Sequence, residues 1–146
     1  NIGTSTSYWN TVFAKATSAQ YADVAERYVA DQNYPVGTVL IIGGEKEVTQ
    51  STKANQTSIA GTVSENPGVL MNRGLEADNV VNVALLGRVP CRVVGDIDKG
   101  DLLTSSDIPG VATRLVDYKP GCVIGKALEN YTGSGEGLIE IMVGRL

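Results

Sequence analysis

From residue 34 onward the chain is divided into short runs rich in Val and Ile, and each run ends in a spacer that contains Gly or Pro. The runs are too short for helices of ordinary length, but they fit β-strands. The clear runs are 36–44, 57–65, 80–95, 101–105, 110–116, 121–130 and 137–146, and a weaker one is 45–52. Many short strands joined by turns predict an all-β fold, a small barrel or sandwich.

The first 33 residues differ from the rest, because Ser, Thr and Ala are frequent there and the β-type runs are missing. We therefore expect an N-terminal arm at 1–33 and a compact β domain at 34–146. Four residues of 17–33 recur at helical spacing, namely Tyr21, Val24, Ala25 and Tyr28. A short helix and an extended arm both fit this stretch.

The single Trp and the single Phe of the chain both lie in this arm. One interpretation is a satellite cluster that packs under the main core of the same chain. The other is burial between subunits, since aromatic side chains are enriched at the centres of interfaces. The residues taken as interface candidates are Tyr8, Trp9, Val12 and Phe13.

Composition removes several classes of function. The formal net charge of −4 argues against a nucleic-acid or anionic-membrane surface, and no apolar run reaches the ~18 residues that a membrane helix needs. The chain has no His, so it lacks the most common general base and the most common transition-metal ligand. The acidic stretch 95–101 lacks the features of an EF-hand and is read as an exposed turn. We expect no catalytic residue, no metal site and no cofactor.

Two cysteines, Cys91 and Cys122, both sit among apolar residues. Two buried thiols and one disulfide are both compatible with this setting.

Several segments, taken together and in order, resemble the C-terminal domains of tailed-bacteriophage fibre, spike and appendage proteins. The domains concerned are of the intramolecular-chaperone type, sometimes called the peptidase G2 family. The resemblance rests on SYWNTVFA at 7–14, SAQYADVAERYVADQNYPVGTVLIIGGEKEV at 18–48, IAGTVSENPGVLMN at 59–72, GRVPCRVVGDIDKGDLLTSSDIPGVATR at 87–114, GCVIGKALEN at 121–130 and GLIEIMVG at 137–144.

The resemblance implies a β-rich virion structural protein, the C-terminal trimerisation domain of a tail or collar fibre. Its partners would be two further copies of the chain, the upstream fibre shaft and other virion proteins. Host attachment through a surface glycan or protein is a further hypothesis that is compatible with this role, and the candidates for that contact are Tyr118 and Tyr131, both in turn regions.

An alternative is a self-cleaving chaperone domain that directs trimer assembly. In the cleaving members of the family a serine precedes the motif Ala-Asp-x-Ala-Glu. Here the motif spans 22–26, but the preceding residue is Tyr21 and the nearest serine is Ser18. This departure from the family pattern favours a domain that is retained and that is not an enzyme.

Overall fold

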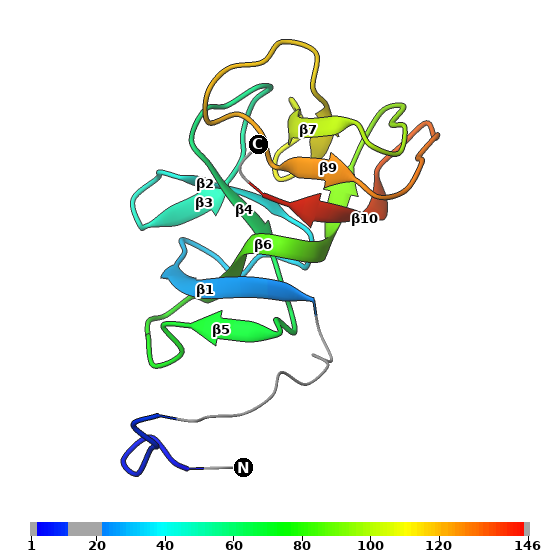
Figure 1. Ribbon diagram of the computed structural model, residues 1–146. Helices are drawn as coiled ribbons and strands as arrows, with labels where there is room; N and C mark the ends of the chain where they lie inside the picture. Colours follow the sequence, from blue (N-terminus) through cyan, green and yellow to red (C-terminus); the bar gives the residue numbers. More distant parts are fainter. Residues whose placement is uncertain (1–2, 12–21, 145–146) are drawn as a thin grey trace.

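In the computed structural model, residues 3–11 and 22–144 are described, and they contain ten β-strands and no helix (Figure 1). The all-β prediction is therefore confirmed. Over the same residues there is no helical segment with the length and hydropathy of a membrane crossing. The strands are β1 (Asp23–Val29), β2 (Val39–Ile42), β3 (Val48–Gln50), β4 (Ile59–Val63), β5 (Val69–Met71), β6 (Val80–Val93), β7 (Leu102–Ser105), β8 (Ala112–Arg114), β9 (Gly125–Ala127) and β10 (Gly137–Val143).

Five strands close into a barrel. β10 pairs antiparallel with β6 and with β9, β9 pairs with β7, β7 pairs with β8, and β8 returns to β6 in parallel. We call this ring, with residues 88–93 of β6, the barrel. Closure leaves no unpaired strand edge in the ring.

The other strands form an open sheet that shares β6 with the barrel. β4 pairs with β6, β2 pairs with β4, and β3 pairs with β2. β1 also runs antiparallel to β6, and it carries β5 in parallel on its other side (Figure 1). We call β1–β5 and residues 80–87 of β6 the open sheet.

Strand β6 has 14 residues and contributes to both regions. The register against β1 shifts at Leu85, because Val24 lies opposite Leu86 whereas Ala25 lies opposite Ala84. A bulge of this kind changes which face of a strand each following side chain points to. Gly87 follows, with a φ of 108°, and a Cβ there would lie 2.2 Å from the Ala22 carbonyl oxygen, so only glycine fits.

Each region has its own buried cluster. The open-sheet cluster consists of Ala30, Leu40, Val48, Ala60, Val63, Val81 and Val83. The larger cluster fills the barrel and reaches β2 and β4, and it contains Val39, Ile41, Ile59, Ala84, Val89, Cys91, Val93, Ile97, Leu103, Ala112, Ile124, Ala127, Ile139, Ile141 and Val143. The turn-bounded runs read from the sequence supply most of these residues.

The helical alternative for 17–33 is wrong over the described part of that stretch, because residues 23–29 form β1. Val24 and Ala25 are adjacent apolar residues of β1 on opposite faces of the sheet, and Val24 is half-buried whereas Ala25 is buried. Apolar residues that are adjacent in sequence then mimic a helical face. The sheet thus begins at Asp23, inside the range expected as an arm, and β5 is a strand that the sequence runs did not indicate.

Candidate association surface

The aromatic residues of the N-terminal segment are exposed where the structure describes them. Tyr8 is 80% exposed and Trp9 is 66% exposed. The turn that precedes them is closed by the Thr4 amide, which donates to the Ser7 carbonyl at 2.7 Å. The other two interface candidates, Val12 and Phe13, lie outside the described residues. The interpretation of Trp9 as part of a cluster under the core of its own chain finds no support in this exposure.

A row of apolar side chains crosses three neighbouring strands of the open sheet. Val24 of β1 pairs with Val69 of β5 on one side and with Leu86 of β6 on the other. Directly paired residues project from the same face of a sheet, so the three side chains are neighbours. Val69 is 56% exposed and Leu86 is 60% exposed, and Met71 extends the row along β5. We call these four residues the apolar row.

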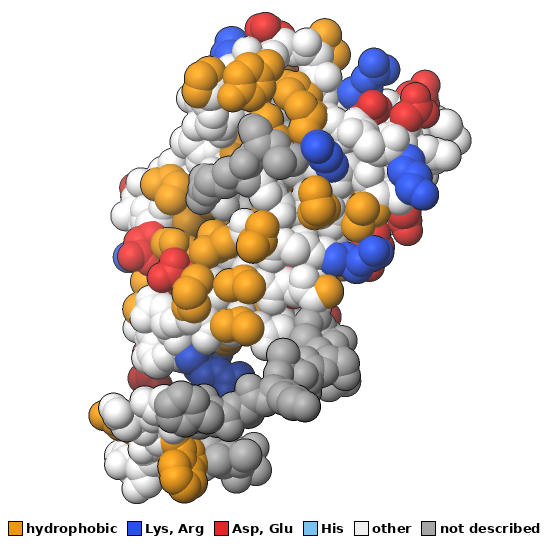
Figure 2. Space-filling model, viewed as in Figure 1, with side chains coloured by type: hydrophobic (Ala, Val, Ile, Leu, Met, Phe, Trp, Pro, Cys, Tyr) orange, Lys and Arg blue, Asp and Glu red, His pale blue; other side chains and the backbone are white. Residues whose placement is uncertain are grey.

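Figure 2 shows hydrophobic side chains gathered over the strands that carry the apolar row. Single exposed apolar residues are ordinary on soluble proteins, but contiguous ones often mark an interaction site. β5 also forms an edge, since β1 is its one partner among the described strands. An exposed edge beside an apolar row is a surface suited to association.

Two side chains of β1 near this row have partners within the chain. The Arg27 Nη1 donates to the Arg73 carbonyl at 2.8 Å, and the Tyr28 hydroxyl donates to the Glu26 carboxylate. The Arg27 contact ties the segment after β5 to β1, whereas the Tyr28 contact lies within β1.

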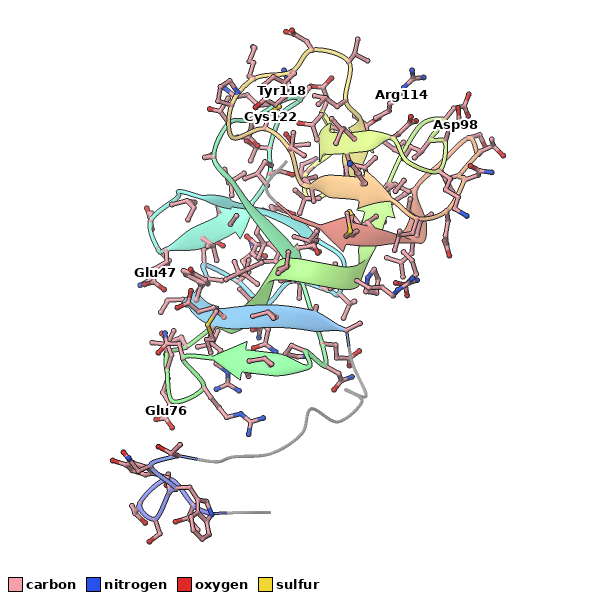
Figure 3. All side chains as sticks on the ribbon, viewed as in Figure 1. Glu47, Glu76, Asp98, Arg114, Tyr118 and Cys122 are labelled. Atoms are coloured by element: carbon pink, nitrogen blue, oxygen red, sulfur yellow. The ribbon has the colours of Figure 1, made fainter. Side chains whose placement is uncertain are left out.

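The two candidate receptor contacts differ in their surroundings. Tyr118 lies in the segment between β8 and β9 and is 59% exposed (Figure 3). Tyr131 is half-buried against the barrel cluster, and its hydroxyl donates to the Gly135 carbonyl at 2.7 Å. The ring of Tyr131 therefore packs on the rim of the barrel. Tyr118 is the one whose ring is open to a ligand.

The acidic stretch 95–101 forms a tight turn. The Asp98 amide donates to Asp101 Oδ2 at 2.9 Å, and the Asp101 amide donates to the Asp98 carbonyl at 3.0 Å. Arg114 lies 3.6 Å from Asp101, and Figure 3 places Arg114 and Asp98 at the same end of the barrel. Within residues 3–11 and 22–144 no set of three or more acidic or cysteine side chains is arranged to hold a metal ion.

Both cysteines are free and buried, which settles the alternatives left open by the sequence in favour of two thiols. Burial raises the pKa of Cys91 to about 12, so this thiol is protonated at neutral pH and is a poor nucleophile. Cys122 Sγ accepts a hydrogen bond from the Lys119 amide at 3.3 Å. Both side chains serve packing.

The motif at 22–26 runs into β1. Asp23 is its first strand residue, and Ala25 is fully buried. Tyr21 and Ser18, on which the question of self-cleavage turns, lie outside the described residues. Sequence reasoning did not anticipate the apolar row, because Val24, Val69 and Leu86 come from three distant segments and meet only through strand pairing.

A scan of the chain against protein-family models finds no match, and a search of curated proteins finds none either. Among solved structures, the chain is similar to the C-terminal fragment of bacteriophage phi29 gene product 12, with a TM-score of 0.59 and 15% identity. The similarity covers 83% of this chain and 99% of that fragment. This chain has the fold of that fragment.

The pre-mature form of bacteriophage phi29 gene product 12 gives a TM-score of 0.63, also at 15% identity. Here the similarity covers 92% of this chain and 23% of the other. The chain thus spans about a quarter of the length of pre-mature gene product 12. At this level of identity the likeness establishes the fold, and function needs separate support.

Proposed function

We propose that this chain is the C-terminal domain of a structural fibre or appendage protein in the virion of a tailed bacteriophage. The observation that carries the proposal is the match in extent: nearly the whole of a phage C-terminal fragment is covered by most of this chain. The family resemblance of the sequence, with its motifs in order, points to the same class of protein.

We further propose that three copies assemble around a common axis. The apolar row supports this, since a strand edge beside exposed Val, Leu and Met side chains is stabilised by burial against a second copy. The exposed Trp9 adds a large apolar surface in the N-terminal segment. A closed symmetric interface keeps identical chains in register, as a shaft requires.

The apolar row can be tested by measuring mass in solution. Sedimentation equilibrium of residues 1–146 is expected to give three times the mass of one chain. Leu86→Lys places a charge in the middle of the row and should shift the protein towards monomer. Val116→Lys is the matched control, because Val116 is exposed in the segment after β8, away from the row.

A monomeric wild-type chain at micromolar concentration would overturn the trimer. If the Leu86→Lys variant is still a trimer, the interface between the copies does not include the apolar row. The same measurement on Trp9→Ser separates the contribution of the N-terminal segment.

Self-cleavage is a second candidate function. One of the similar structures is of pre-mature gene product 12, and the motif at 22–26 of this chain is the one that the sequence resemblance associates with cleavage. Expression of a longer precursor should then give a fragment that starts near Ser18 or Tyr21. If the precursor stays intact, the domain is retained on the fibre.

Attachment to a host surface is the role that we assign to the exposed Tyr118. An exposed aromatic ring can stack on a sugar or a partner side chain. Tyr118→Ala should reduce binding of the assembled fibre to host cells, whereas Tyr131→Phe should not, since Tyr131 packs on the barrel. Equal binding by Tyr118→Ala and wild type would remove this contact.

A further inference from the structure

A polar hollow of about 520 Å³ lies beside β5, between the segments that precede and follow this strand. This volume is within the range of small-ligand sites. Its polar walls are Arg27 of β1, Asn82 of β6, Glu65 and Asn66 before β5, and Arg73 after β5. We call it the arginine hollow.

Strand pairing places two of these side chains next to each other. Arg27 and Asn82 lie directly opposite in the β1–β6 pair, so both project from the same face of the open sheet. Ala25, two residues before Arg27, lies opposite Leu70 of β5, which also lines the hollow. The residues of the apolar row in β1 and β5 alternate with these and point the other way. The arginine hollow and the apolar row therefore occupy opposite faces of the sheet.

The guanidinium of Arg27 is held in position by one hydrogen bond. Its Nη1 donates to the Arg73 carbonyl at 2.8 Å, and the side chain is half-buried. This contact brings the backbone of the second arginine to the first, and it leaves the remaining N–H groups of the Arg27 guanidinium for another acceptor. A guanidinium that is already fixed loses little conformational freedom when it binds a ligand.

The other polar side chains of the hollow have no partner within the described chain. Asn66, Arg73 and Asn82 make no side-chain hydrogen bond there, although Asn82 is half-buried. The ion pairs among the described residues lie elsewhere, at Arg92 and at Arg114. A half-buried amide without a partner is stabilised by a ligand that supplies one.

The charge and the donor set of the walls indicate the chemistry of a ligand. Two arginines outnumber one carboxylate, Glu65, so an anion is favoured. The guanidinium fork matches the two oxygens of a carboxylate. Glu65 would repel a dianion such as phosphate, but it accepts hydrogen bonds from hydroxyl groups, and the amides of Asn66 and Asn82 both donate and accept. Pro67 and Leu70 add apolar surface for the C–H groups of a ring.

We propose that the arginine hollow binds a sugar that carries a carboxylate, of the uronic acid class. Arg27 and Arg73 donate to the carboxylate. The sugar hydroxyls exchange hydrogen bonds with Asn66, Asn82 and Glu65. The proposal does not depend on the oligomeric state or on the role assigned to the exposed tyrosine.

The test is a titration of the ¹⁵N-labelled chain with sodium D-glucuronate at constant ionic strength, followed by N–H chemical shifts. Saturable shifts are expected at the Gly68 amide, at the side-chain amide of Asn82 and at the Arg27 Nε–H group. D-Glucose lacks the carboxylate and should bind at least tenfold more weakly. Shifts that do not saturate, or equal binding of D-glucose, overturn the proposal.

Variants identify the groups responsible. Arg27→Gln and Arg73→Gln should each weaken D-glucuronate binding by about tenfold, the effect of losing a hydrogen bond to a charged group. Arg88→Gln is the matched control, since it removes the same charge from an exposed position of β6 that does not line the hollow. If Arg27→Gln loses its dispersed spectrum, Arg73→Gln carries the test, because Arg73 is exposed. Wild-type affinity in Arg73→Gln overturns the proposal.

Two further anions separate the sugar from other carriers of negative charge. Weaker binding of sodium phosphate and of Nα-acetyl-glutamate amide than of D-glucuronate supports a site for an acidic sugar. Tighter binding of phosphate would indicate a phosphate site. Equal or tighter binding of Nα-acetyl-glutamate amide would indicate an acidic polypeptide, and either of these two results overturns the proposal.

Discussion

The barrel and the open sheet are built from the same kinds of residue, but they differ in whether their outermost strands are paired on both sides. The barrel returns through β8 and β10 to β6, so every strand in the ring has two neighbours. The open sheet ends in β3 and β5, which have one strand partner each among the described residues, and it carries the apolar row beside β5. The barrel therefore satisfies its strand edges within one chain. The open sheet leaves a strand edge and exposed apolar side chains that a second molecule would cover.

The strongest test of this comparison concerns the closure of the barrel at Gly125. A Cβ at this residue would lie 2.0 Å from the Met142 carbonyl oxygen across the β9–β10 pair. Gly125→Ala should therefore cost about 3 kcal/mol or more in the free energy of unfolding, because backbone has to move. Urea denaturation measures this. Gly135→Ala, where a Cβ meets nothing within 4 Å, is the control, and similar midpoints for the two variants would contradict the account of the closure.

The two cores can be compared through one truncation in each. Ile141→Ala in the barrel and Leu40→Ala in the open sheet both remove a fully buried side chain. We expect losses of about 3–4 kcal/mol and about 2–3 kcal/mol, because a core enclosed by a ring of strands collapses less around a cavity. The free energies of unfolding from urea curves decide the order. A larger loss for Leu40→Ala would reverse the comparison.

Arg92 of β6 contacts both the segment before β10 and the segment before β2. Arg92 Nη2 lies 2.8 Å from Glu136 Oε1, and Arg92 Nη1 donates to Thr38 Oγ1 at 3.1 Å. The hydrogen bond from Arg92 holds the pKa of Glu136 below its ordinary value of 4.5. A lowered carboxyl pKa stabilises the fold above the unfolded-state value, and the contribution is lost as the pH falls through the folded-state pKa.

Glu136→Gln should therefore cost a few tenths to about 1 kcal/mol near pH 7, a small effect because the pair is partly exposed to solvent. The difference between variant and wild type should shrink as the pH falls below about 4.5. Thermal unfolding across this range measures it. A difference that is constant with pH would assign the effect to packing rather than to charge.

The smallest expected effect is at the barrel rim. Tyr131→Phe removes the hydrogen bond to Gly135 but keeps the ring against the core, so it should cost about 0.5–1 kcal/mol. Tyr118→Phe, at an exposed position, is the matched control and should leave stability unchanged. Equal melting temperatures for both variants and wild type would show that the Tyr131 hydroxyl contributes nothing.

The sequence predicted the strands whose signal is local. Val39–Ile42, Ile59–Val63 and Val80–Val93 are Val- and Ile-rich runs that end at turns, and they can be read without knowledge of the rest of the chain. β1 and β5 could not be read in this way, because they are stabilised by pairing Val24 with Val69 across a long stretch of chain.

The same reason limits prediction of sites. Asp23 stood out as part of a motif, but Glu140, which lines one hollow of the surface together with Asp23, lies far away in sequence and has no motif of its own. The exposed tyrosine at 118 was indicated by its turn, whereas the packing of Tyr131 depends on the barrel cluster. Residue type predicts candidates, and strand register decides which of them meet.

Strand β6 is a single segment that two cores use at once. A slip of one position along it would turn Val83 and Cys91 away from their own clusters together, so an error in either half disturbs both. A partly correct alignment of β6 therefore gains little stability, because a misaligned strand disrupts both hydrophobic clusters at once. This disfavours folded states in which one of the two regions is correctly paired and the other is not.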